Sequence, residues 1–249
     1  MDLYYEVSGR GKPLVLLHSG AADLRDWIYI TPVLAKQYKV IALDGRGAGK
    51  SPVPLTPPNY VEDLNKLLNH MELEKVTLVG HSIGGQLATE FTLEYPELVE
   101  KLILIAPGLS GFVYSNEFIS KIQAVSEAAP NLDKMVELAL EVPTNKVIIN
   151  HPNRKLMDDM LRHHFIRLKE WATFESIWPE VPAIERLSEL SAKTLYMIGK
   201  MDHVENYRLS EYFRQVPDIQ FVEIEGADHM VTLTHPMEVA NHILRFLEE

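Results

Sequence analysis

A chain of 249 residues, 46% hydrophobic and 24% charged, has the length and composition of one large folded domain. Its formal net charge of -11 disfavours the phosphate backbone of nucleic acids and anionic membrane surfaces as partners. The lack of cysteine excludes disulfides, thiolate metal sites and cysteine nucleophiles.

The first residues, Met1 to Glu6, contain no basic stretch followed by an apolar one, as a secretory signal would. The longest apolar runs, such as Leu14 to Leu17, are far shorter than the ~20 residues of a membrane-spanning helix. We therefore expect a cytoplasmic protein that acts on a small molecule and binds neither nucleic acid nor membrane.

Short apolar runs rich in β-forming residues alternate along the chain with amphipathic stretches. Continuous apolar strands are typical of a sheet covered on both faces, and apolar residues three or four apart indicate helices. The alternation predicts an α/β fold with a mostly parallel, doubly wound sheet and helices on both faces. In chain order the predicted elements are strand 14–18, helix 31–36, strand 40–43, helix 61–71, strand 76–80, helix 86–95, strand 102–106, strand 194–199, helix 206–215, strand 221–224 and helix 236–247.

The alternation stops between about residues 111 and 190, where the pattern is helical, is punctuated by five prolines and contains no convincing strand. This predicts a core domain of residues 1–110 and 191–249 with an inserted helical lid, 111–190. The lid is rich in aromatic residues that could wall an apolar pocket. Tyr114 and Trp178 are the candidates for substrate contact, although packing within the lid is favoured for any single one of them.

The segment Gly80-His81-Ser82-Ile83-Gly84 fits the G-x-S-x-G pattern, in which a strand turns sharply into a helix and exposes a serine hydroxyl. An apolar run precedes it and a helical pattern follows it, as this turn requires. The glycines keep side chains away from the strained serine backbone. Ser82 is therefore the candidate nucleophile, and the N-terminus of the following helix offers amide groups to a developing oxyanion.

A serine hydroxyl is a weak nucleophile until a base takes its proton, and a carboxylate usually orients that base. His229 follows the last predicted strand and Asp202 follows the strand before it. Because both residues come directly after strands of one parallel sheet, we expect them at the same edge as Ser82. Glu205 and Asp228 remain alternatives for the acid because they lie in the same two loops.

With these loops the chain resembles the α/β-hydrolase superfamily over nearly its whole length, in particular its small lidded esterases, lactonases and carbon–carbon-bond hydrolases. The resemblance includes His18-Ser19-Gly20 after the first parallel strand and residues 44–51 after the second. It implies two oxyanion donors, the amides of Gly20 and Ile83, each worth about 3 kcal/mol in the transition state. Ser19 is a third candidate donor, because many relatives have glycine in its place.

The resemblance has further implications for the rest of the chain. Residues 3–7 match only the second strand of the usual N-terminal hairpin, which predicts a shorter antiparallel edge. Trp27 lies near the oxyanion loop and is a candidate pocket residue, with packing as an equal alternative. Asp44 and Arg46 are interpreted as turn-forming and packing residues.

The remaining histidines that attract attention are interpreted structurally. His163 and His164 are adjacent, and because adjacent side chains on a helix diverge by about 100°, we interpret the pair as lid surface rather than metal ligands. We interpret His203 as an exposed loop residue. No metal or organic cofactor is implied.

The expected function is hydrolysis of a small to medium carboxylic ester or lactone through an acyl-serine intermediate, the chemistry of class EC 3.1.1. A serine at position 82 argues against haloalkane dehalogenases and epoxide hydrolases of this fold, which need a carboxylate there. Carbon–carbon-bond hydrolases, hydroxynitrile lyases and perhydrolases use the same triad and remain alternatives. A non-catalytic small-molecule receptor or signalling protein is the alternative from another class, and the oligomeric state is left open.

Overall fold

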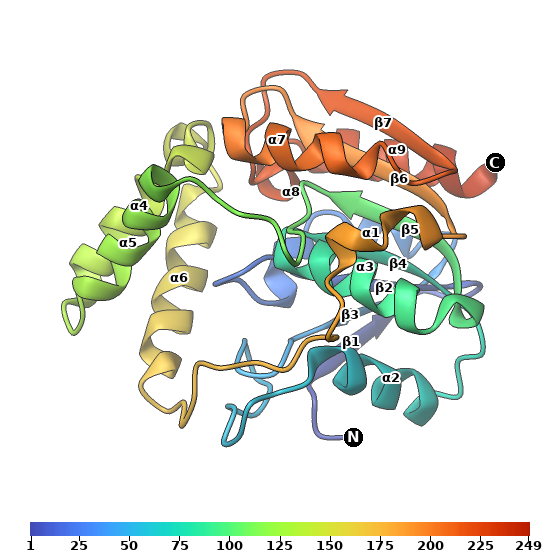
Figure 1. The fold of residues 1–249 in the computed structure, drawn as a ribbon, viewed down its shortest axis with the longest axis horizontal. Coiled ribbons are helices and arrows are strands. Elements are labelled where there is room, and N and C mark those ends of the chain that lie inside the picture. Colours follow the sequence, from blue (N-terminus) through green and yellow to red (C-terminus); the bar gives the residue numbers. More distant parts are fainter.

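The computed structural model describes residues 1–249. A seven-stranded sheet forms its centre, in the order β1-β3-β2-β4-β5-β6-β7 (Figure 1). All neighbouring strands are parallel except β1, which pairs antiparallel with β3 at the edge. The predicted mostly parallel sheet is thereby confirmed, with one antiparallel edge strand. The strands are β1 Tyr5–Ser8, β2 Pro13–Leu17, β3 Lys39–Leu43, β4 Val76–His81, β5 Val99–Ile105, β6 Lys193–Gly199 and β7 Ile219–Ile224.

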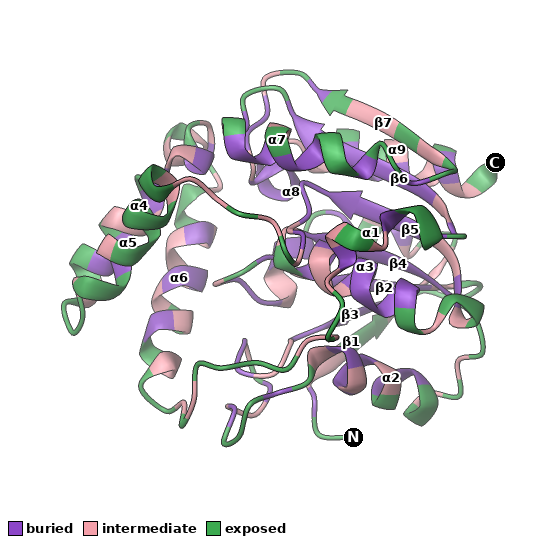
Figure 2. Cartoon of the chain, in the orientation of Figure 1, coloured by how far each residue is buried: buried purple, intermediate pink, exposed green.

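Helices cover both faces of this sheet, because successive side chains of each buried strand point to opposite faces. In β2, Val15 packs on the face covered by α2, α3 and α7, whereas Leu16 packs on the face covered by α1 and α9. Figure 2 shows the central strands as buried along most of their length. The helices are α1 Thr31–Leu34, α2 Tyr60–His70, α3 Ile83–Glu94, α7 Val204–Phe213, α8 Val231–Thr234 and α9 Pro236–Glu248.

The chain between β5 and β6 forms three helices, α4 (Asn116–Glu127), α5 (Leu132–Leu140) and α6 (Arg154–Leu168), and adds no strand to the sheet. They stand beside the sheet on the left of Figure 1. Their apolar faces form a separate core that includes Val136 and Met160, joined by Met230 and Leu233 from the loop and helix after β7. The helical segment therefore packs against the carboxyl edge of the sheet.

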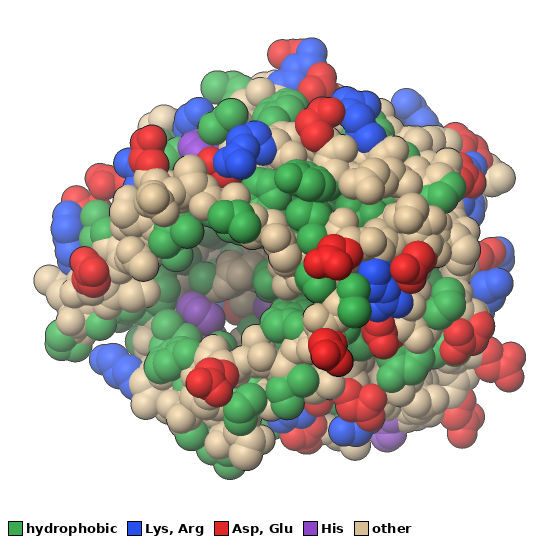
Figure 3. Space-filling model, viewed as in Figure 1, with side chains coloured by type: hydrophobic (Ala, Val, Ile, Leu, Met, Phe, Trp, Pro, Cys, Tyr) green, Lys and Arg blue, Asp and Glu red, His purple; other side chains and the backbone are tan.

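Figure 3 shows that this face of the molecule is hollowed beside the helical segment, with histidine side chains visible inside the hollow. The loops after β2, β4, β6 and β7 all reach the same edge, because these strands run parallel. None of the helices combines the length and the apolar character needed to cross a lipid bilayer.

Candidate active site

The turn between β4 and α3 holds Ser82 in a conformation that few side chains adopt, with φ 54° and ψ -116°. Its amide donates to the carbonyl of Ile105 at 3.0 Å, and its carbonyl accepts from the amide of Gly108 at 2.8 Å. A Cβ at Gly84 would lie 2.2 Å from the carbonyl oxygen of Leu17, so only glycine fits there. The end of β5 and the loop after β2 thus fix the turn from two sides. The Ser82 hydroxyl has no hydrogen-bond partner in the protein.

His229 and Asp202 lie together at the same edge. The Nδ1 of His229 is 3.1 Å from Oδ2 of the buried Asp202. The other carboxylate oxygen, Oδ1, accepts from the amide of His203 at 2.6 Å and from Nδ2 of Asn206 at 2.7 Å. These two donors hold the carboxylate in place. Nδ2 of Asn206 also lies 3.1 Å from Nδ1 of His229. With a proton on Nδ1 directed at Asp202, Nε2 of His229 would be free to accept one.

The charge of Asp202 also changes the proton affinity of His229. Burial lowers the pKa of the imidazole, but the charge of Asp202 and its hydrogen bond outweigh burial, so that the pKa is raised above 6.5. His229 therefore loses its proton, and becomes able to act as a base, at a higher pH than an ordinary histidine.

The two alternative acids point elsewhere. Glu205 pairs with Arg208 at 2.7 Å. Asp228 accepts from the amides of Val147 and Ile148 at 2.7 and 3.0 Å, and so ties the helical segment to the loop that carries His229. Of the three carboxylates considered from the sequence, Asp202 is the one that contacts His229.

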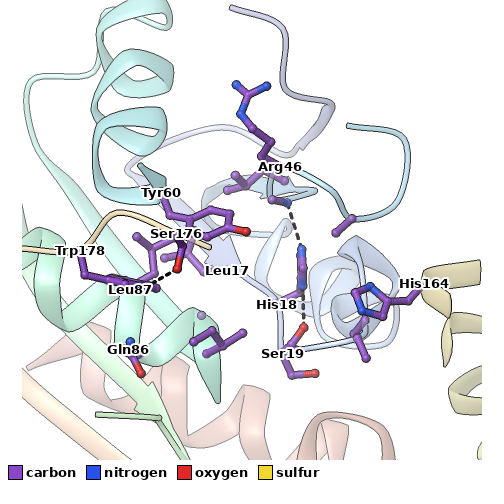
Figure 4. A pocket seen from close by; sticks show the side chains of 18 of the residues that line it. Leu17, His18, Ser19, Arg46, Tyr60, Gln86, Leu87, His164, Ser176 and Trp178 are labelled. Carbon is purple, nitrogen blue, oxygen red and sulfur yellow. Dashed lines mark hydrogen bonds between the residues drawn. The ribbon is translucent and has the colours of Figure 1, made fainter. Parts of the chain in front are cut away.

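Two cavities flank the serine turn. The first, here called the His229 cavity, has a volume of about 420 Å³; Ser82, His229 and Asn206 line it from the sheet domain. Residues of the helical segment close it, including the predicted Tyr114. The second, here called the Gly20 cavity, has a volume of about 390 Å³ and contains the predicted Trp178 in its wall. Figure 4 shows the side chains around this second cavity.

Two backbone amides at the border of the Gly20 cavity are available to an oxyanion. The amide of Ile83 opens α3 and the amide of Gly20 lies in the loop after β2; neither has an acceptor within the protein. The two residues are close, since a Cβ at Gly20 would lie 3.7 Å from Cγ2 of Ile83. The amide of Ser19 is engaged, because it donates to Oδ2 of Asp26 at 2.9 Å. Only the hydroxyl of Ser19 is free.

A buried hydrogen-bond network beneath the site was missed in the sequence. Asp26 is fully buried and accepts from Nδ1 of His81 at 2.8 Å and from the hydroxyl of Thr232 at 2.6 Å, in addition to Ser19. The Nε2 of His81 donates to the carbonyl of His229 at 2.9 Å. Burial alone would raise the pKa of Asp26, but the facing His81 and the hydrogen bonds hold it well below its usual range. The network joins the loops after β2, β4 and β7.

The structure decides one alternative left open by the sequence and overturns one interpretation. Trp27 is completely buried, with its ring edge-on to His81 at 6.4 Å, and lines neither cavity, so the packing alternative holds. His164 is not surface: it lines the Gly20 cavity, and burial, followed by nearby positive groups, lowers its pKa to about 4. Its neighbour His163 is exposed, as predicted for both.

Two other polar residues have structural contacts. His203 is not a free loop residue, because it caps α7 and packs on Phe118 with ring centroids 5.2 Å apart. Asp44 accepts from the amides of Leu24 and Lys50, both at 2.8 Å, in line with its predicted turn-forming role. No group of three or more His, Asp and Glu side chains is arranged to hold a metal ion.

Comparison with known proteins identifies the family of the chain. Residues 12–179 match the model of a family described as the alpha/beta hydrolase fold. The chain belongs to the α/β-hydrolase fold family. Among solved structures, a thermophilic esterase from Thermogutta terrifontis is 26% identical, with a TM-score of 0.82 over 99% of this chain and 93% of the esterase.

Two curated relatives differ in the reaction that their names describe. A 2-hydroxy-6-oxo-6-(2'-aminophenyl)hexa-2,4-dienoic acid hydrolase from Metapseudomonas resinovorans is 26% identical over 99% of this chain and 88% of its own length. A soluble epoxide hydrolase from Corynebacterium sp. (strain C12) is 38% identical, but the match spans 43% of this chain and 39% of that protein. Together these matches support a hydrolase.

Proposed function

We propose that the chain hydrolyses carboxylic esters or lactones through an acyl-serine intermediate formed on Ser82. The contact of His229 with Asp202, at the edge of a cavity that Ser82 also lines, carries this proposal. The strained serine turn and two unengaged amides support it further, because acyl transfer needs a nucleophile, a base and an oxyanion site together.

In the first half of the reaction, Nε2 of His229 takes the proton of Ser82 as its oxygen attacks the carbonyl carbon. The amides of Gly20 and Ile83 stabilise the oxyanion that forms. The protonated His229 then gives its proton to the leaving alcohol oxygen, and the carbon–oxygen bond breaks. In the second half, a water takes the place of the alcohol, His229 removes its proton, and the acid leaves as Ser82 is restored.

The helical segment, residues 111–190, serves in this proposal as a lid that shapes both cavities. Tyr114, Phe118 and Thr144 contribute to the His229 cavity, and Trp171 and Trp178 to the Gly20 cavity. Walls of this size and apolar character suit small or medium acyl and alcohol groups.

Activity-based labelling tests the nucleophile. A fluorophosphonate should label the native chain and fail to label Ser82→Ala. Ser176→Ala is the matched control, because Ser176 lines the other cavity and bonds Trp178 rather than a base. If Ser82→Ala labels as strongly as the native chain, Ser82 is not the nucleophile. If the native chain does not label, the non-catalytic receptor becomes the favoured alternative.

Hydrolysis of a carbon–carbon bond is the second candidate, favoured by the full-length match to the dienoic acid hydrolase. A substrate of that kind carries a carboxylate, which requires a cation or several donors when it is buried. The one arginine that lines either cavity, Arg46, already pairs with Asp63 and Asp2. Ester hydrolysis therefore ranks first. Turnover of a p-nitrophenyl ester series that declines from short chains to dodecanoate would support a bounded ester site.

A further inference from the structure

The Gly20 cavity concentrates buried polar atoms that have no partner in the protein. Six buried side-chain nitrogen or oxygen atoms in the whole chain lack a hydrogen bond, and three of them belong to residues lining this cavity: Oγ of Ser19, Nδ1 of His164 and Nε1 of Trp171. Ser19 is 2% exposed. Because an unsatisfied buried polar group costs free energy, such a cluster is expected where a ligand completes the bonds.

Two of these groups are held firmly by their surroundings. The ring of Trp171 lies over Gly47, whose φ is +87°, and a Cβ at that position would be 2.2 Å from the ring. The imidazole of His164 meets the edge of the same indole, with ring centroids 5.9 Å apart and planes at 86°. Figure 4 shows Ser19 and His164 on neighbouring parts of the cavity wall.

The chemistry of the three atoms specifies an uncharged oxygen. The indole of Trp171 can only donate, whereas the hydroxyl of Ser19 can donate or accept. His164, with its pKa lowered to about 4, is neutral at pH 7, so its Nδ1 can also donate or accept. A ketone, ether or hydroxyl oxygen satisfies such a set.

A carboxylate does not fit, because no positive charge is free to meet it. In Arg46, Nε lies 2.8 Å from Asp63 and Nη1 lies 3.0 Å from Asp2, so the guanidinium is already neutralised by two carboxylates. The ring of His18 donates from Nδ1 to the carbonyl of Ser19 at 2.7 Å and accepts at Nε2 from the amide of Gly45 at 3.0 Å. With one nitrogen donating and the other accepting, His18 is neutral as well.

The acyl half of an ester is the half that reaches this cavity. The leaving alcohol must receive its proton from His229, which lines the other cavity. In the proposed reaction the carbonyl oxygen must face the amides of Gly20 and Ile83, which lie at the border of the Gly20 cavity. The acyl chain therefore extends away from His229 and past Ile83, where the apolar walls formed by Leu17 and Leu87 can hold its methylene groups.

We infer that the preferred substrates are esters of medium-chain carboxylic acids that carry an uncharged oxygen along the acyl chain, recognised by Trp171, Ser19 and His164. This substrate class presupposes the serine hydrolase function proposed above. A site built to bond a substrate oxygen discriminates against the analogue that lacks it, because its own polar groups are then left unpaired.

Matched p-nitrophenyl esters test the acyl preference. We expect kcat/KM for the 5-oxohexanoate or 6-oxoheptanoate ester to exceed that for the hexanoate or heptanoate ester by about tenfold, the effect of one to two hydrogen bonds. The glutarate and adipate monoesters, which end in a carboxylate, should fall at least about tenfold below the hydrocarbon esters. Equal or lower rates for both oxo esters, or a preference for the carboxylate esters, would overturn the inference.

Paired tryptophan variants locate the recognition. Trp171→Phe keeps an aromatic ring but removes the unpartnered N–H, and should reduce the oxo-to-hydrocarbon ratio by about fivefold. Trp27→Phe is the matched control, because Nε1 of Trp27 is also buried without a partner but Trp27 lines neither cavity, so its ratio should remain that of the native chain. The ratio compares two substrates on the same sample and is independent of the fraction of folded enzyme. A native ratio in Trp171→Phe would overturn the assignment.

Failure of this inference differs from failure of the proposed function. If fluorophosphonate labels Ser82 and the hydrocarbon esters are hydrolysed, but the oxo esters show no advantage, the acyl recognition is wrong and the serine hydrolase stands. If Ser82 does not label and no ester is hydrolysed, the proposed function itself fails, and the inference fails with it.

Discussion

The loops at the carboxyl edge of the sheet and the helical segment between β5 and β6 are built in different ways. At the sheet edge, carboxylates are buried and saturated with hydrogen bonds: Asp26 accepts three and Asp202 holds both His229 and Asn206. In the helical segment the charged groups pair at the surface, as Arg162 does with Asp158 and Asp133. The sheet edge therefore holds its polar side chains rigidly, whereas the helical segment contributes mainly an apolar wall to the two cavities.

The difference follows from how each region is held. Parallel strands in a fixed register bring the loops after β2, β4, β6 and β7 to one edge with little freedom. The helical segment is attached to that edge by a shared apolar core and by hydrogen bonds between loops, such as those from the amides of Val147 and Ile148 to Asp228. Substitutions at the edge should therefore have much larger effects than substitutions on the helices.

The largest effect is expected from Asp202→Asn. The asparagine amide can present a donor to Nδ1 of His229, which stabilises the wrong tautomer, so kcat should fall by about four orders of magnitude. The fall in kcat can be measured by steady-state hydrolysis of p-nitrophenyl acetate, with the concentration of active sites determined by fluorophosphonate labelling. Near-native turnover would move the orienting role to Glu205 or Asp228.

Asp26→Leu tests the buried network as a source of stability. The leucine leaves His81, Thr232 and the amide of Ser19 without their acceptor, and breaking a buried charge pair costs about 3 to 5 kcal/mol. Urea unfolding should show a loss of this size. Asp26→Asn keeps an acceptor in place and should lose less than Asp26→Leu; equal losses in the two variants would count against a hydrogen-bond origin.

The pH dependence tests the pairing of His229 with Asp202. Protonated His229 cannot accept the proton of Ser82, and its raised pKa keeps the proton on to higher pH than in an ordinary histidine. The acid limb of kcat/KM should therefore have its midpoint above pH 6.5, with about a tenfold loss for each pH unit below it. An acid limb centred below pH 6.5 would show that the charge of Asp202 does not outweigh burial in setting the pKa of His229.

The smallest effect is expected on the helical segment. Arg162→Ala removes two exposed ion pairs, which contribute little because water screens them. The urea midpoint and the activity with p-nitrophenyl acetate should match those of the native chain within experimental error. A clear loss of stability would mean that the exposed ion pairs of Arg162 contribute substantially to the stability of the helical segment.

Much of the fold could be predicted from local pattern. The strands predicted at 14–18, 40–43 and 194–199 lie within a residue of the observed bounds, because their residues are almost all apolar. The start of β5 was missed by three residues, since Glu100 and Lys101 interrupt the apolar run. Helix α3 was predicted to begin at residue 86, because Gly84 and Gly85 suggest a turn, but it begins at Ile83. Those glycines allow the helix to pack against neighbouring backbone.

The site could be predicted where a residue follows a strand, and not where it depends on packing between distant segments. Ser82, Asp202 and His229 each come directly after a strand, so the sheet alone places them together. His164 lies on a helix that the sequence cannot orient, and its position against the loop after β2 appears only in three dimensions. The sequence left pocket and packing open for Trp27 for the same reason, since its burial depends on contacts with distant segments in the core.

The contact between Gly47 and Trp171 makes a residue of the turn after β3 a control point for the shape of the Gly20 cavity. The lack of a side chain at Gly47 is what lets the indole lie against that turn while Trp171 forms part of the cavity wall. A single methyl group added at position 47 would displace that indole and reshape the Gly20 cavity without altering Ser82, Asp202 or His229. The shape of this cavity can thus change in evolution, or by engineering, through a position that does not line it.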